Sequence, residues 1–157
     1  MHTPPDTHGP GIRLHPPIIY AISILSGIGL NNLWPQAMPY DIHGYTWGGI
    51  LIALAVAIAA WSLLQFHKAD TDVRPDKPDS SLITSGPFRF TRNPLYIVLT
   101  LTQITAALWL DNLWILLLVM PSVVVITFYA IAREERYLET LFGQDYLDYK
   151  KRVRRWL

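Results

Sequence analysis

The sequence has no cysteine and is poor in charge. Of its 157 residues, 16% are Asp, Glu, Lys or Arg, whereas 51% are apolar. A chain without thiols forms neither disulfides nor zinc-thiolate sites, so cysteine usage gives no indication of the redox compartment. The low share of charge and the positive mean hydropathy are unusual for a soluble domain and typical of a membrane protein. The length fits one domain.

Residues 1–17 lack the basic start and the apolar core of a cleaved signal peptide. They contain several prolines together with His2, His8 and His15. Scattered histidines of this kind are more often a feature of tail composition than metal ligands. We therefore predict a mobile N-terminal tail over 1–17, a membrane domain over 18–157, and no metal site.

Four apolar stretches follow, over residues 18–34, 45–66, 95–110 and 113–132. A helix needs about 20 mostly apolar residues to cross a bilayer, so the second and fourth stretches are the strongest candidates. The third is short, and only two residues separate it from the fourth. These two form either a spanning or a re-entrant hairpin, and we predict a spanning one. Pro121 predicts a kink in the fourth stretch because it lacks a backbone donor; a proline that the helix tolerates is the alternative.

Lys and Arg are confined to three places: Arg13, the loop 67–93, and the region from Arg133 onward. The connectors 35–44 and 111–112 contain neither residue type. Four crossings put the three basic places on one side of the membrane, which the positive-inside tendency makes cytoplasmic. We predict an all-α integral membrane protein with about four transmembrane helices, a cytoplasmic loop and an amphipathic C-terminal helical tail.

The basic run from Lys150 to Arg155 is interleaved with apolar and aromatic residues. A segment of this kind is typical of a tail that lies on anionic lipid headgroups. Binding of nucleic acid would also explain the basic run, but we do not favour it. We predict membrane lipids as partners and no nucleic acid.

Two turn signals mark the end of the 67–93 loop. Gly86-Pro87 predicts a turn, because glycine accepts unusual dihedral angles and proline restricts its predecessor. Asn93-Pro94 is typical of an N-cap followed by proline in the first helical turn. This pair either starts a transmembrane helix cleanly or exposes N–H groups that form a site for a carboxylate.

Glu134 and Glu135 flank an apolar stripe on the helix that continues from the fourth stretch. The stripe consists of Ile131, Leu138, Leu141 and Phe142, at helical spacing. Carboxylates near a buried face are costly unless they meet a cation. The cation is either that of a bound ligand or, for Glu135, a basic neighbour at a solvated helix end. Gly143 then has the position of a helix C-cap.

Residues 82–96 (LITSGPFRFTRNPLY) and 133–152, with the Glu134-Glu135 pair, resemble the signature of the isoprenylcysteine carboxyl methyltransferase and phospholipid N-methyltransferase superfamily. The resemblance covers about residues 45–155. Members are integral-membrane enzymes that use S-adenosylmethionine. The resemblance therefore implies methyl transfer at the cytoplasmic face to an amphiphilic or apolar acceptor, with lipid-like or small apolar substrates.

The resemblance also implies which residues contact the cofactor. They are Ser80, Ser81, Leu82, Ile83, Gly86, Phe88, Asn93, Pro94, Leu95, Tyr96, Glu134 and Glu135. Candidates on the substrate side are Arg133 and Tyr137, and no catalytic residue is assigned. Methyl transfer is an in-line displacement from a cationic sulfur, so it depends on positioning and on exclusion of water. Aromatic faces such as that of Phe88 would surround the cation.

The chain departs from the superfamily pattern at four places. Asn93 stands where many members have histidine, and Phe88 where tyrosine is common. Ala130 aligns with the arginine that prenylcysteine enzymes use to hold the substrate carboxylate, which argues against prenylcysteine activity. The glycine-x-glycine of the phospholipid enzymes is replaced by the residues 85–87.

Two other functions stay open. One is an NADPH-dependent membrane reductase, because sterol reductases share a related C-terminal architecture; the Glu134-Glu135 pair and the short chain argue against it. The other is a non-catalytic membrane protein that keeps only the fold, against which the full set of motifs argues. A binding test with S-adenosylhomocysteine and with NADPH separates the methyltransferase from the reductase.

Overall fold

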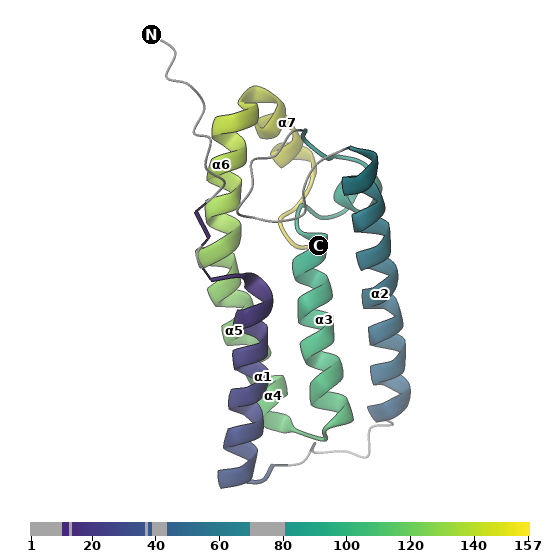
Figure 1. The fold of residues 1–157 in the computed structure, drawn as a ribbon, viewed down its shortest axis with the longest axis vertical. Helices are drawn as coiled ribbons and strands as arrows, with labels where there is room; N and C mark the ends of the chain where they lie inside the picture. Colours follow the sequence, from purple (N-terminus) through teal and green to yellow (C-terminus); the bar gives the residue numbers. More distant parts are fainter. Residues whose placement is uncertain (1–10, 13, 37, 39–43, 70–80) are drawn as a thin grey trace.

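The computed structural model describes residues 11–12, 14–36, 38, 44–69 and 81–157. This part of the chain is helical and contains no β-strand. Long helices stand side by side in a bundle (Figure 1). They are α1 (Pro16–Leu33), α2 (Gly44–Lys68), α3 (Pro94–Trp109) and a helical run over Leu113–Phe142.

Three of these helices, α1, α2 and the run Leu113–Phe142, are long and apolar enough to cross a membrane. The shorter α3 is also apolar. Large apolar side chains face outward along them; Leu25 and Val56, for example, are 67% and 61% exposed. Such a surface suits lipid, and helices satisfy their own backbone hydrogen bonds there. The predicted all-α membrane fold is confirmed.

The last helical run is irregular. It consists of α4 (Leu113–Leu117), α5 (Val119–Ile126), the π-helical segment η2 (Thr127–Ile131) and α6 (Ala132–Phe142). The interruption at Leu118 precedes Pro121 by three residues, where the missing N–H and the proline ring disturb the preceding turn. The π-helical segment was not predicted. Segments of this type are rare in proteins, and those that occur are often found at functional sites.

Polar side chains join the helices inside the bundle. The hydroxyl groups of Tyr20 and Thr100 are 2.8 Å apart, and Gln103 Nε2 donates to Ser23 Oγ across 2.9 Å. Ser122 Oγ donates to the same Ser23 oxygen across 2.8 Å. Because lipid tails offer no hydrophobic drive between helices, such bonds help to hold α1, α3 and α5 together.

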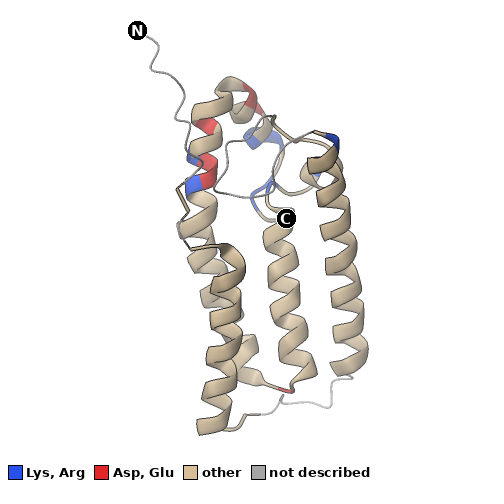
Figure 2. Cartoon of the chain, in the orientation of Figure 1, with Lys and Arg blue, Asp and Glu red and all other residues tan. Residues whose placement is uncertain are grey.

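The two ends of the bundle differ in charge. Apart from Asp111, the charged residues of the described ranges lie at the end formed by α6, α7 (Gln144–Arg152) and the last turn of α2 (Figure 2). At the opposite end, Asp111 adopts a positive φ of 45°, and Trp114 Nε1 donates to Trp34 O across 2.8 Å. Indole groups in such a place are typical of a membrane–water interface.

The charged end contains the short elements of the chain. The 3₁₀-helix η1 (Gly86–Arg89) packs beside the end of α2, and Gly143 (φ 54°) separates α6 from α7 as the predicted C-cap. The predicted mobile tail lies mostly outside the described residues. Ile12 is buried in the core, and Leu14 N donates to Tyr129 Oη across 3.0 Å.

Candidate functional site

Tyr96 and Glu134 meet at the charged end of the bundle. Tyr96 lies in the first turn of α3 and is buried in the core cluster, whereas Glu134 lies in the first turn of α6 and is half-buried. The Tyr96 hydroxyl donates to Glu134 Oε1 across 2.6 Å. A hydrogen bond to a carboxylate is short and strong. The structure thus brings together two predicted cofactor contacts that are 38 residues apart.

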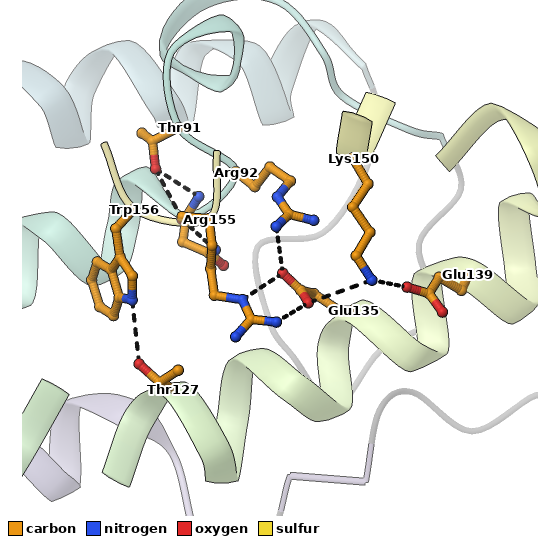
Figure 3. Close-up of polar contacts among 9 residues, drawn as sticks. Thr91, Arg92, Thr127, Glu135, Glu139, Lys150, Arg155 and Trp156 are labelled. Atoms are coloured by element: carbon orange, nitrogen blue, oxygen red, sulfur yellow. Dashed lines mark hydrogen bonds and ion pairs between the residues drawn. The ribbon is translucent and has the colours of Figure 1, made fainter. Parts of the chain in front are cut away.

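Glu135 lies in a cluster of cations (Figure 3). Its side chain is 6% exposed, and its carboxylate accepts two hydrogen bonds from Arg155, at 3.0 and 2.6 Å. Arg92 Nη2 lies 3.2 Å away, and Lys150 Nζ, which also pairs with Glu139, lies 4.0 Å away. The protein itself therefore neutralises this carboxylate. Of the two alternatives that the sequence left open for Glu135, the structure shows the basic neighbour.

Residues 153–157, which we call the strap, follow α7 and run back to the start of α3. Thr91 and Arg154 form a parallel bridge, in which Arg92 N donates to Arg154 O across 2.9 Å. Asn93 Nδ2 donates to Arg155 O across 2.8 Å. Asn93 occupies the N-cap position before Pro94, but its side chain makes no capping bond. A carbonyl oxygen of the strap thus lies at the Asn93 side chain, and the predicted carboxylate site at the backbone N–H groups of this helix start stays a prediction.

The strap also reaches the π-helical segment. Trp156 Nε1 donates to Thr127 Oγ1 across 3.2 Å (Figure 3), and the indole packs against the buried cluster around Tyr96 and Ala130. Thr127 in turn donates to Val123 O across 2.6 Å. The strap thus links the start of α3 to η2 and α6.

The predicted contacts before α3 lie near the end of α2. The Phe88 ring meets Phe66 edge-on at 5.6 Å, and Phe88 O accepts from Tyr149 Oη across 2.7 Å. A Cβ on Gly86 would lie 2.7 Å from the Gln65 side chain, and Gly86 has a φ of 61°. Ser81 Oγ donates to Ala69 O. Glycine at 86 is therefore required by both backbone and packing.

The other predicted residues are spread around this end. Leu82, Ile83 and Leu95 are half-buried, and Pro94 is buried at the start of α3. The Arg133 guanidinium lies 4.5 Å from the centre of the Tyr129 ring, and Tyr137 is half-buried on α6. Ser80 lies outside the described residues. The predicted roles of all these residues stay predictions.

Two tyrosines of α7 complete the buried part of this end. Burial raises the pKa of Tyr146, and the Glu135 charge acts in the same direction. Burial likewise raises the pKa of Tyr149, with the Tyr146 side chain as a further cause. The paired Glu135 carboxylate raises the pKa of Arg155. Tyr146 and Tyr149 therefore stay neutral, while Arg155 stays charged.

Sequence reasoning did not assign Arg92, Arg155 and Trp156 to the site. Arg155 and Trp156 were placed on lipid headgroups, since a basic, aromatic tail is typical of that location. The apolar residues Val153 and Trp156, which interrupt the basic residues of 151–156, are the one sequence signal that this segment has a buried side.

The fold and the site define a class: an all-α membrane protein whose polar chemistry is gathered at one end of a helical bundle. The chain belongs to the phospholipid methyltransferase family, whose model matches residues 44–145. This match confirms the predicted superfamily and makes the protein a membrane methyltransferase.

A relative from Haemophilus influenzae (strain ATCC 51907 / DSM 11121 / KW20 / Rd), described as an uncharacterized protein, is 46% identical over 63 residues. The matched part is 40% of this chain and 100% of that protein. No solved structure matches the chain.

Proposed function

We propose that the protein transfers a methyl group from S-adenosylmethionine to a lipid-like acceptor that arrives from the bilayer. The single observation that carries this proposal is the Tyr96–Glu134 pair. It is a carboxylate held half-buried by a 2.6 Å hydrogen bond, beside an apolar cluster, in a chain of the phospholipid methyltransferase family. By the family resemblance, a glutamate at this place of the motif contacts the cofactor, and we expect the same of Glu134.

The residues of this end fit the cofactor. Its sulfonium and ammonium groups are cations for Glu134, and its carboxylate is an anion for hydrogen-bond donors. Arg92 Nε and Nη1 are buried and have no hydrogen-bond partner among the described residues. Glu134, Tyr96 and Arg92 are therefore the residues that we expect to hold it. When bound, S-adenosylmethionine supplies an activated methyl group.

The protein has mainly to position the two reactants. Tyr96 fixes the Glu134 carboxylate, and the buried cluster of Ile126, Ala130 and Ile131 keeps water from that side. Holding a nucleophile in line with the methyl group supplies much of the rate in such displacements. The exposed apolar side chains on the helices suit an acceptor with a hydrocarbon part, such as a phospholipid amine or a hydrophobic thiol.

Four crossings would place the site at the cytoplasmic face. Apart from Asp111, the charged residues of the described ranges gather at the site's end of the bundle (Figure 2). The basic residues among them favour the cytoplasmic side. The α3 helix, with 16 residues, is short but apolar, and it runs alongside the other helices of the bundle (Figure 1).

Calorimetry on purified protein tests the proposal. We expect S-adenosylhomocysteine to bind with a dissociation constant in the micromolar range or tighter, about −8 kcal/mol. NADPH, offered under the same conditions, should not bind. Binding of NADPH alone would favour the reductase function over S-adenosylmethionine-dependent methyl transfer. Binding of neither ligand would contradict both functions.

A further inference from the structure

The strap covers a row of hydrogen-bond donors at the start of α3. Arg92 N donates to Arg154 O across 2.9 Å. Asn93 Nδ2 and Thr91 Oγ1 donate to Arg155 O, across 2.8 and 3.2 Å. Two carbonyl oxygens thus accept from three donors. An oxyanion would meet the same donors, and hydrogen bonds to a charged acceptor are about twice as strong as neutral ones.

The side chain of Arg92 lies beside the strap and has unused donors. It is 9% exposed and reaches Glu135 with Nη2 alone. Its Nε and Nη1 atoms are buried and lack a hydrogen-bond partner in the described part of the chain. A buried donor without an acceptor is costly. An anion bound next to Arg92 would remove this cost.

The strap can lift without leaving a buried charge unpaired. Its Arg155 side chain is 36% exposed, and Trp156 is half-buried. When Arg155 leaves, Glu135 keeps Arg92 at 3.2 Å and Lys150 at 4.0 Å. The attachments of the strap are therefore local, and the buried carboxylate does not depend on them.

We propose that Thr91, Arg92 and Asn93 form a binding site for an oxyanion, a carboxylate or a phosphate, which the strap closes until the ligand displaces it. This proposal rests on the proposed function only in the identity of the molecule that carries the oxyanion. The carboxylate would be that of the cofactor's methionine part, and the phosphate would be that of a lipid headgroup.

A reversible lock on the strap tests this site. Because the chain has no cysteine, the double variant Thr91→Cys/Arg154→Cys contains one possible disulfide, between two residues that face each other in the bridge. Oxidation closes the strap, and dithiothreitol reopens it in the same protein. The single variant Arg154→Cys, oxidised in parallel, is the matched control.

Two pairs of probes distinguish the sources of the oxyanion. S-adenosylhomocysteine carries the carboxylate that methylthioadenosine lacks. Dihexanoyl phosphatidylethanolamine carries the phosphate that dihexanoylglycerol lacks. In each pair we call the member that carries the carboxylate or phosphate the anionic probe. We expect the oxidised double variant to bind the anionic probe of one pair at least tenfold more weakly than its reduced form, with the other member of that pair unaffected.

Equal binding of every probe in the locked and open forms overturns the proposal. If no adenosyl probe binds to the wild type, the proposed function fails, and the phosphate pair alone decides the site. Binding of neither anionic probe to the wild type overturns the site as well. As a second variant, Arg92→Lys keeps the charge but loses the Nε and Nη1 donors, and should weaken the same anionic probe at least fivefold.

Discussion

The Tyr96 hydroxyl donates to Glu134 Oε1 across 2.6 Å and thereby ties the first turn of α3 to the first turn of α6. Both residues belong to the segments that carry the family resemblance, and a buried aromatic ring positions the carboxylate. Beside this pair, the guanidinium groups of Arg92 and Arg155 neutralise the carboxylate of Glu135. By the resemblance, the first glutamate of the motif is the expected contact of the cofactor, while its neighbour supports the structure.

This division predicts different results for the two partners of the pair. Glu134→Gln should weaken S-adenosylhomocysteine binding by about 1.5–3 kcal/mol, the usual contribution of a hydrogen bond to a charged group. Tyr96→Phe keeps the charge and loses only the hydrogen bond, so it should cost about 0.5–1.5 kcal/mol. Calorimetry measures both changes. An equal loss in the two variants would mean that Tyr96 contacts the ligand directly.

A second prediction concerns stability and the neighbouring glutamate. Glu135→Ala leaves the buried Arg92 without its carboxylate and should lower the free energy of unfolding by about 3–5 kcal/mol. Arg155→Ala, at a partly exposed partner, should cost about 1 kcal/mol. Lys151→Ala, which removes an exposed pair with Asp148, is the control and should change little. Unfolding in detergent should show this order; a reversed order would contradict the structural role of Glu135.

The sequence predicted the helices well because apolar runs, prolines and glycines act locally. The residue pattern also indicated that Glu134 lies beside an apolar stripe, that Asn93 has the N-cap position of α3, and that Gly143 ends α6. It could not indicate that Asn93 bonds to Arg155, since the two residues are 62 positions apart and meet only through the tertiary fold. The π-helical segment at Thr127 has no simple residue signature, and the role of Trp156 depends on it.

A third prediction concerns the close contact of α1 with α4. A Cβ on Gly27 would lie 2.6 Å from Ile115 Cγ1 and 2.9 Å from Ile115 Cα. Gly27→Ala should therefore push the two helices apart and cost about 1–3 kcal/mol of stability. Gly29 lies two residues further along α1 and has nothing within 4 Å of an added Cβ. Gly29→Ala should be neutral or slightly stabilising; equal melting temperatures would contradict the packing.

The fourth prediction tests the crossings. Single cysteines at Lys68 and Gln144, both at the charged end, should react with an impermeant maleimide only from the cytoplasmic side. A cysteine at Gln36, at the opposite end, should react only from the other side. Because the natural sequence has no cysteine, any labelling of a variant comes from the introduced residue. Labelling of positions 68 and 144 from opposite faces would separate the two halves of the site.

The last prediction concerns the acceptor. Ala130 lies at the place where prenylcysteine enzymes, by the resemblance, carry a carboxylate-binding arginine. It is fully buried in the π-helical segment, among Tyr20, Tyr96 and Ile126. Among the described residues of this core cluster, none is a cation that could hold a substrate carboxylate. We therefore expect a lipid amine to be a better acceptor than the carboxylate of a farnesylcysteine.

Radiolabelled S-adenosylmethionine decides between the two acceptors. Label should enter the organic-soluble product of vesicles that contain phosphatidylethanolamine, and Glu134→Gln should reduce this incorporation at least tenfold, as its weaker cofactor binding requires. N-acetyl-farnesylcysteine should receive little label. If it were labelled efficiently and released base-labile methanol, a cation near Ala130 would have to hold its carboxylate. Arg133, whose guanidinium lies over the Tyr129 ring one turn further along, would be that cation, and Arg133→Gln should then abolish the labelling.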